Sequence, residues 1–254
     1  MAERVEIAPQ CCSGIYNFQS YKLLVSDLNT VPLNGKVLIN TISPNSYGLA
    51  LKDGKTKEAL KRSDILILDG LYFGLAPLLL RRMKVRRITG WDAFTFFSKK
   101  MDELKGRVFF LGSSSDTLMK IKRRYSAEYP NTAIDYYSPP FAKEFSEQEN
   151  ARIVTAVNAF HPDVLFVAMT APKQEKWSYE NKDRLNAHVI CTVGNVFDWY
   201  AGNSKRPGKI WIDLGLEWLI RIFLRPEIFR RNIGNQLLFF WHLFLALLRI
   251  KAFD

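Results

Sequence analysis

The chain has 254 residues, of which 48% are hydrophobic and 24% are charged, so we expect a packed globular chain rather than a disordered one. Its formal net charge of +11 indicates an anionic partner, such as a nucleic acid, a phosphate-bearing ligand or an acidic membrane surface. The cysteines Cys11, Cys12 and Cys191 lack metal-ligand spacing, and no apolar run is long enough to span a bilayer. We therefore expect a reducing compartment and no transmembrane helix.

Short apolar runs alternate with helix-like segments along most of the chain. Residues 1–35 are weakly patterned, and a short helix is expected within 18–29. Strands are expected at 36–40, 64–70, 86–90, 107–115, 133–137, 163–169 and 188–194, with helices at 71–83, 91–104, 116–130 and 145–160. Apolar runs without polar alternation are typical of strands that are covered on both faces. The pattern therefore predicts an α/β fold, a Rossmann-like parallel sheet flanked by helices.

The last part of the chain has no strand pattern. It contains an amphipathic segment at 209–223, a basic one at 225–232 and an apolar, aromatic-rich one at 237–253. We therefore divide the chain into a Rossmann-like core, 1–203, and a C-terminal helical appendage, 204–254. The apolar helix could pack into a core or a dimer interface. The flanking arginines and lysines favour instead a helix lying in an anionic membrane surface, through residues 225–253.

Polar residues follow two of the predicted strands at their carboxyl ends, where open α/β sheets bind ligands. Asp69 either forms an Asp-Gly turn with Gly70 or faces the crevice as a general base or a ligand of a substrate hydroxyl. Asn40 and Thr41 end what could be the neighbouring strand. Side chains from these two strand ends could converge on one site.

Three further turns carry candidate binding residues. Gly112 and Ser113 lie in a strand–loop–helix, which suits either a phosphate or an ordinary turn, because a full GxGxxG motif is absent. The segment 172–175 opens a helix, and its lysine and amide could hold a diphosphate and a sugar or base edge; the alternative is a plain helix start. Gly194 and Asp198 follow the last predicted strand.

Several function classes lack support. The histidines at 161, 188 and 242 are isolated, so no metal site is predicted, and no GxSxG motif indicates a serine hydrolase. A nucleic-acid-binding protein would explain the positive charge, but no recognition motif occurs. A non-catalytic peripheral membrane protein also stays open at this point.

Taken together, these segments resemble the WecG/TagA/CpsF glycosyltransferase family (glycosyltransferase family 26) over about residues 36–232. The resemblance is carried by NTISPNS at 40–46, LDG at 68–70, RRITGWD at 86–92, FFLGSSSD at 109–116, PPF at 139–141, APKQEKW at 171–177, VGNVFDWYAG at 193–202, KRP at 205–207 and GLEWLIRIFLRPEIFRR at 215–231. The chain departs from the family's usual glycines before PKQE, where it has Met169, Thr170 and Ala171, and before FD, where it has Gly194 and Asn195. Arg206-Pro207-Gly208 stands where the family has RAP.

The resemblance implies an inverting, metal-independent glycosyltransferase without a cofactor. It would move a sugar from a UDP-sugar to a polyprenyl-diphosphate-linked saccharide, in bacterial cell-surface polysaccharide biosynthesis, as a peripheral protein at the cytoplasmic face of the cell membrane. It also implies that the appendage contacts the membrane and completes the active site. Neither the donor sugar nor homo-oligomer formation is defined by it.

The same resemblance implies roles for individual residues. Asp69 would be the catalytic base, with Thr41 beside it in the pocket. The donor would be held by Asn40, Gly112, Ser113, Lys173, Gln174, Glu175, Gly194 and Asp198. The acceptor diphosphate would face Arg206, Arg221 and Arg231.

Overall fold

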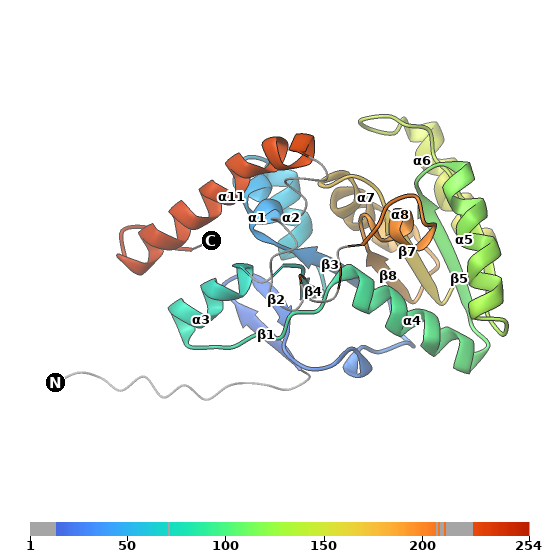
Figure 1. Cartoon of the computed structure of the whole chain (residues 1–254), viewed down its shortest axis with the longest axis horizontal. Helices are drawn as coiled ribbons and strands as arrows, with labels where there is room; N and C mark the ends of the chain where they lie inside the picture. Colours follow the sequence, from blue (N-terminus) through green and yellow to red (C-terminus); the bar gives the residue numbers. More distant parts are fainter. Residues whose placement is uncertain (1–13, 71, 207, 209–210, 212–225, 254) are drawn as a thin grey trace.

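An eight-stranded sheet lies at the centre of the computed structural model, which describes residues 14–70, 72–206, 208, 211 and 226–253 (Figure 1). The strand order is β1-β2-β4-β3-β8-β7-β5-β6. The strands are β1 (Ile15–Phe18), β2 (Tyr21–Leu24), β3 (Val37–Ile42), β4 (Ile65–Leu68), β5 (Arg107–Gly112), β6 (Ala133–Tyr137), β7 (Val164–Ala168) and β8 (Val189–Thr192). All pairings among them are parallel except β1 with β2. This topology confirms the predicted α/β class and parallel sheet.

Helices flank both faces of the sheet. One layer contains α4 (Gly90–Leu104), α5 (Ser115–Glu128) and α8 (Val196–Tyr200). The opposite layer contains α1 (Pro44–Ala50), α2 (Gly54–Lys61), α6 (Glu147–Phe160) and α7 (Lys173–Asn181). Alternate residues of the central strands enter different clusters: Ile39 and Phe166 pack with α4 and α5, whereas Leu38 and Leu165 pack with α6 and α7. A shift of one residue along a strand therefore moves a side chain to the other face.

Two expectations about the first half of the chain were wrong. Residues 18–29 form no α-helix, because β1 and β2 make an antiparallel hairpin whose turn holds Gln19 at a φ of 55°. Buried Tyr21 and Leu23 alternate with exposed Lys22, which is the strand period. The strand expected at 86–90 is reduced to one bridge, from Leu68 to Arg87.

The remaining short elements connect the layers. They are α3 (Leu75–Arg81) and the 3₁₀ turns η1 (Leu28–Thr30), η2 (Tyr72–Gly74) and η3 (Lys182–Arg184). The helix expected at 209–223 lies outside the described residues, apart from Trp211.

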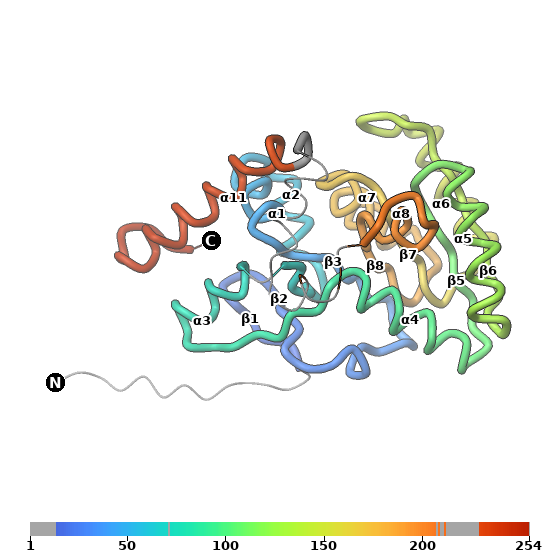
Figure 2. Tube along the Cα trace, in the orientation of Figure 1, coloured from blue at the N-terminus to red at the C-terminus, as the bar shows by residue number. Residues whose placement is uncertain are grey.

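The C-terminal helix α11 (Pro226–Leu247) packs against α1, beside which its trace runs in Figure 2. Its buried Phe239 and Leu243 join a cluster with β1, β2 and α1. A Cβ on Gly48 of α1 would lie only 2.2 Å from the carbonyl oxygen of Asn235, so glycine permits this close approach. Within the described part of the chain, no helix has the length and apolar character needed to cross a membrane.

Candidate active site

The ends of β3 and β4 bring Asp69 and Thr41 together. Thr41 pairs with Ile67 across the parallel ladder, and the backbone N–H of Asp69 donates to the carbonyl oxygen of Ile42 at 3.0 Å. Because side chains alternate along a strand, Asp69 shares a face with Ile67 and hence with Thr41. Both side chains are half-buried, so they are held by the sheet yet accessible to a substrate.

The same edge of the sheet continues into the second half of the chain. β3 pairs with β8, and β8 pairs with β7, both in parallel. The turns after these strands, at 169–173 and 193–195, therefore lie beside the ends of β3 and β4. The strand order thus brings these segments, which are distant in sequence, to one edge of the sheet.

Arg87 lies beside the strand that carries Asp69, a position that the sequence pattern did not single out. After α3 the chain returns along β4, where Arg87 bridges Leu68, and the N–H of Ile88 donates to the carbonyl oxygen of Leu68 at 3.2 Å. A half-buried guanidinium group is thereby fixed near the end of β4. In the sequence, Arg87 is marked only by its position shortly before Thr89, where a helix begins.

Gln174 joins the turns after β7 and β8. Its Oε1 accepts hydrogen bonds from the N–H of Met169 at 3.3 Å and of Gly194 at 3.2 Å, while Nε2 donates to Oε1 of Glu175 at 2.9 Å. Gly194 has a φ of 59°, which suits glycine. The Gln174 amide is buried, so in this structure it sets the geometry of both turns.

Glu175 is a buried acid behind these turns. Burial raises the pKa of its carboxyl above the ordinary value, although the hydrogen bond from Gln174 lowers it. Its Oε2 has no hydrogen-bond partner in the described structure. The raised pKa favours a neutral carboxyl group, because an unpaired carboxylate is costly in an apolar interior. Its position supports the turn from behind and differs from the donor contact that was expected.

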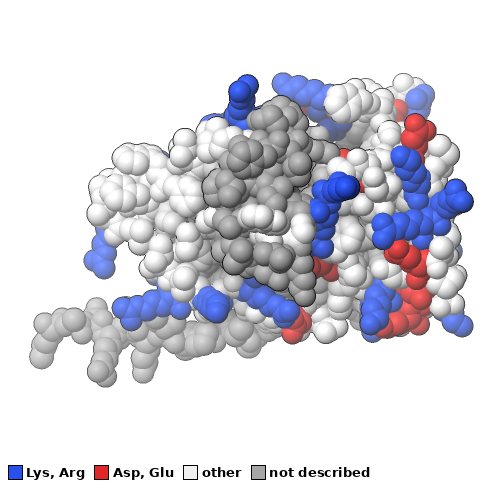
Figure 3. Space-filling view, in the orientation of Figure 1, with Lys and Arg blue, Asp and Glu red and all other residues white. Residues whose placement is uncertain are grey.

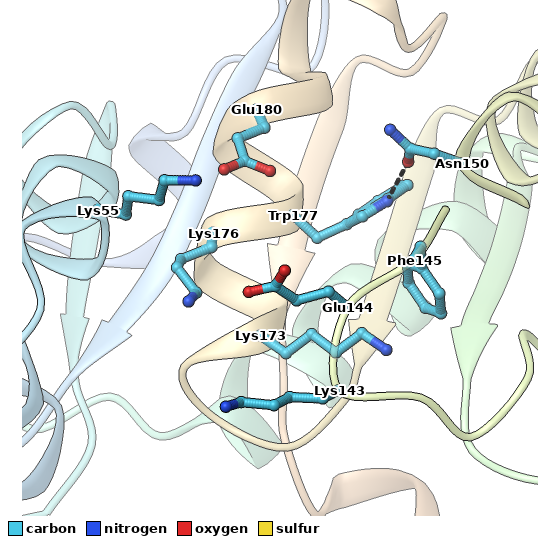
Figure 4. Close-up of a pocket in the computed structure, with 9 residues that line it drawn as sticks. All are labelled: Lys55, Lys143, Glu144, Phe145, Asn150, Lys173, Lys176, Trp177 and Glu180. Atoms are coloured by element: carbon cyan, nitrogen blue, oxygen red, sulfur yellow. Dashed lines mark hydrogen bonds between the residues drawn. The ribbon is translucent and has the colours of Figure 1, made fainter. Parts of the chain in front are cut away.

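Lys173 holds a neighbouring loop. Its Nζ donates to the carbonyl oxygen of Ala142 at 2.6 Å and lies 3.4 Å from the ring centroid of Phe145. Figure 4 shows the amine directed towards Phe145. Burial lowers the pKa of this ammonium group. In this arrangement Lys173 braces the loop after β6, and its expected contact with the donor stays a prediction.

A basic pocket of 150 Å³ lies along the outer side of α7, beside this loop (Figure 4). Its lining comes from α2, α6, α7 and the loop: Lys55, Lys143, Glu144, Phe145, Asn150, Lys173, Lys176, Trp177 and Glu180. Several of the lining groups already have partners, since Trp177 Nε1 donates to Asn150 Oδ1 at 2.6 Å and Lys176 pairs with Asp53 at 3.3 Å. The pocket lies on the surface of α7. This helix covers one face of the sheet, and the side chains of Asp69 and Thr41 lie on the other face.

Gly112 and Ser113 form a tightly packed turn at the end of β5. Gly112 has a φ of 114°, and a Cβ there would lie 2.1 Å from the carbonyl oxygen of Ala168 on β7. Ser113 has a φ of 60°, and its carbonyl oxygen accepts from Ser138 Oγ at 2.8 Å. Packing thus explains the glycine, and phosphate binding by the start of α5 stays a prediction.

Asp198 and Arg206 lie near the start of α4. The Asn195 amide, with its nitrogen towards Asp198 Oδ2 at 3.0 Å and its oxygen towards Trp199 Nε1 at 2.9 Å, orients the half-buried Asp198. The guanidinium carbon of Arg206 lies 4.8 Å from the ring centroid of Trp91. Trp91 follows Arg87 closely, so Arg206 is brought to the end of the sheet where Asp69 lies.

The other predicted residues are placed differently. Asn40 is fully buried on the opposite face from Thr41: its Nδ2 donates to Ser63 Oγ at 2.9 Å, and its Oδ1 accepts from Thr192 Oγ1 at 2.8 Å. The Asn40 amide therefore joins neighbouring strands and loops inside the core. It does not line a pocket, so the expected contact with the donor is not found there. Arg231 is exposed on α11, and Arg221 lies outside the described residues. No cluster of three or more potential metal ligands of the types His, Cys, Asp and Glu occurs among the described residues.

Comparison with known proteins identifies the family. A model described as the glycosyl transferase WecG/TagA/CpsF family matches residues 17–252. An N-acetylglucosaminyldiphosphoundecaprenol N-acetyl-beta-D-mannosaminyltransferase of Bacillus subtilis (strain 168) is 29% identical over 197 residues, which cover 78% of this chain and 75% of the relative. The protein of the same name from Staphylococcus aureus (strain NCTC 8325) is 24% identical over 188 residues, covering 74% and 72%. The chain therefore belongs to the WecG/TagA/CpsF family and is a glycosyltransferase.

Proposed function

We propose that the protein transfers a sugar from a UDP-sugar to a polyprenyl-diphosphate-linked saccharide, with inversion at the anomeric carbon and without a metal ion. The reaction would serve the synthesis of a bacterial cell-surface polysaccharide. Support comes from family membership over residues 17–252 and from the relatives, whose names specify an N-acetylglucosaminyl-diphosphoundecaprenol acceptor and a transferred N-acetylmannosamine. We take this donor and acceptor pair as the first to test.

The observation that carries the proposal is the position of Asp69 and Thr41 on one face at the carboxyl edge of the sheet. In the proposed step, Asp69 takes the proton of the acceptor hydroxyl as its oxygen attacks the anomeric carbon. The new carbon–oxygen bond forms as the bond to UDP breaks, and UDP leaves with the electron pair. Thr41, beside the base, would hydrogen-bond a substrate hydroxyl. A base fixed by the ladder suits this role, because general-base catalysis requires exact placement.

The donor would bind along the turns that Gln174 joins. In this proposal backbone N–H groups at the start of α7 face the diphosphate, Gly194 lets the chain pass close to it because it lacks a side chain, and Asp198 faces the sugar or nucleoside. Gln174 and Glu175 act from behind by holding the turns, as their burial indicates. Preorganised backbone donors of this kind stabilise charge that develops on a leaving diphosphate.

Arginine side chains would supply the positive charge that a metal ion gives in other transferases. Arg206, which lies against Trp91, is one described candidate, and Arg231 and Arg221 are proposed for the acceptor diphosphate. We add Arg87 as a candidate, because its bridge to Leu68 places it at the same end of β4 as Asp69. Guanidinium groups suit this task, since they bind phosphate oxygens in a bidentate manner.

The acceptor's lipid tail requires access to a membrane. We infer peripheral attachment at the cytoplasmic face through α11, since its outward side is apolar and basic residues follow it. Figure 3 shows the end of the molecule formed by this helix as largely uncharged, with Lys and Arg at its margins. An interfacial helix of this kind binds through apolar burial together with attraction to anionic lipids.

The test is a turnover assay with UDP-N-acetylmannosamine and a lipid-diphosphate-linked N-acetylglucosamine, in the presence of a chelator. We expect release of UDP and a product of inverted anomeric configuration, with a rate unchanged by EDTA. Loss of the activity on chelation, restored by a divalent cation, would contradict metal independence. Vesicle binding without turnover of any UDP-sugar would favour a non-catalytic membrane protein instead.

A further inference from the structure

Helix α3 exposes leucines that a folded chain normally buries. Its inner side packs through buried Ala76 and Pro77, whereas Leu78 and Leu79 are 42% and 52% exposed. The helix follows directly from the Asp69 turn through η2. Adjacent exposed leucines on so short a helix indicate a surface that something else covers.

The exposed side of α11 continues this surface. Its buried residues, at 235, 239, 242 and 243, form one side, and its exposed apolar residues form another: Leu237, Phe240, Trp241, Phe244, Leu247 and Leu248. These exposed positions recur at the spacing of a single helix face. The rings of Tyr72, at the start of η2, and Phe240 meet edge to face at 6.1 Å. Figure 1 shows α3 and α11 at the same end of the molecule.

The charged residues named next, which end or follow α3 and follow α11, are basic. Exposed Arg81, Arg82 and Lys84 follow α3, and exposed Arg249 and Lys251 follow α11. Between residues 70 and 91 the chain contains no aspartate or glutamate. An apolar face flanked by these basic residues matches an anionic bilayer, whose head groups attract lysine and arginine while its interior accepts leucine and aromatic side chains.

We propose that α3 is a second membrane-contacting element and that α3 and α11 together seat the protein on an anionic lipid bilayer. The inference rests on the proposed function, in which the acceptor is anchored in that bilayer. Because Asp69 precedes Tyr72 by only three residues, contact of α3 with the bilayer would set the distance of the base from the lipid head groups. The acceptor diphosphate then meets the site from between the two helices.

The proposal is tested by charge substitution on α3, with vesicle binding measured in the absence of substrates. The variant is Leu78→Glu/Leu79→Glu. The matched control is Leu104→Glu/Met119→Glu, whose leucine and methionine are 55% and 51% exposed, on α4 and α5. We expect the α3 variant to bind phosphatidylglycerol-containing vesicles at least about tenfold more weakly than the control, which keeps wild-type binding. Equal binding by both variants would overturn the proposal.

A local probe gives a readout that a folding defect cannot imitate. A solvatochromic label is placed at Leu79→Cys, or at Met119→Cys as the control, in a chain with serine at positions 11 and 12. Cys191 does not react, because it is fully buried and burial raises the pKa of its thiol to about 12. We expect vesicles to shift the emission of the label at 79 to the blue and to leave that at 119 unchanged.

The outcomes separate this inference from the proposed function. No shift at 79 on vesicles that bind the protein would overturn the role of α3, whatever the turnover assay shows. A blue shift that rises with protein concentration without vesicles would assign the surface to a second copy of the chain and overturn the proposal. Absence of turnover, together with a vesicle-dependent shift of the label at 79, would contradict the proposed reaction but support membrane contact through α3.

Discussion

Replacing Gly48 with alanine is expected to push α11 away from α1. Gly48 lies inside α1, and the added Cβ would be 2.2 Å from the carbonyl oxygen of Asn235 and 2.7 Å from its Cα. These atoms are backbone, so no side-chain rotation relieves the clash. Because ordinary contacts lie beyond 3.4 Å, the helices must separate by about 1 Å.

The separation weakens a buried contact set. Tyr47 Oη lies 3.1 Å from His242 Nδ1, Lys52 Nζ donates to Asn235 Oδ1 at 2.7 Å, and Phe239 is fully buried at the interface. Overpacking of this kind typically costs about 1–3 kcal/mol. Alanine also has a helix propensity up to about 1 kcal/mol more favourable than that of glycine. This gain in stability opposes the cost of overpacking, so a control variant must share it.

Gly234→Ala is the matched control, since Gly234 lies on α11 and a Cβ there meets no atom within 4 Å. The two variants share the propensity gain, so the free energy of unfolding of Gly48→Ala should be about 1–3 kcal/mol lower than that of Gly234→Ala. Urea unfolding measures this difference, and hydrogen exchange of residues 230–247 measures detachment of α11. Equal stability and equal exchange in the two variants would refute the close helix contact.

Two further predictions concern the sheet edge. Burial raises the pKa of Glu175 above its ordinary 4.5, so the folded state holds more protons and the free energy of unfolding falls as pH rises from 4.5 towards the raised pKa. Glu175→Gln should remove this slope in thermal melts at several pH values, whereas exposed Glu103→Gln should keep it. Gly112→Ala should lower both the melting temperature and the affinity for UDP in a thermal-shift titration, because its Cβ would lie 2.1 Å from Ala168 O. Gly35→Ala, which meets no atom within 4 Å, should change neither, and equal effects of the two would count against the tight turn.

The sheet and the Asp69–Thr41 pair were accessible from sequence because they depend on short-range pattern. Buried apolar runs alternating with helices predict parallel strands, and parallel strands bring their carboxyl ends to one edge. The register adds that Thr41 pairs with Ile67, so Asp69 falls on the same face. Neither inference needs side-chain detail.

Other roles required information that the sequence pattern lacks. Asn40 precedes Thr41 by one residue, and this single step turns its amide into the core, where Ser63 and Thr192 satisfy it. Gln174 carries a polar group that suits a ligand equally well, but its acceptor is used by two backbone N–H groups. Arg87 became visible only through its bridge to β4. Long-range pairings of this kind are set by tertiary packing.

The hairpin of β1 and β2 at the edge of the sheet also could not be predicted from the sequence pattern. Its turn is held by Gln19 at a φ of 55°, without the Asn-Gly or Asp-Gly pair that announces a tight hairpin turn in sequence. Buried Phe18 and Tyr21 pair across the two strands, and the ring centroid of Phe18 lies 5.6 Å from that of Phe253, which follows α11. The C-terminal residues thus help to define a strand pair formed near the start of the chain.

The central claim, that Asp69 is the base of a sugar transfer, is tested most directly by comparing Asp69→Asn with exposed Asp135→Asn in the UDP-release assay with the lipid-diphosphate acceptor. Loss of a general base predicts a fall in turnover of about 100- to 10,000-fold for Asp69→Asn, with UDP still raising its melting temperature. The Asp135 variant should match the wild type. Near-normal turnover of Asp69→Asn with this pair would contradict the account.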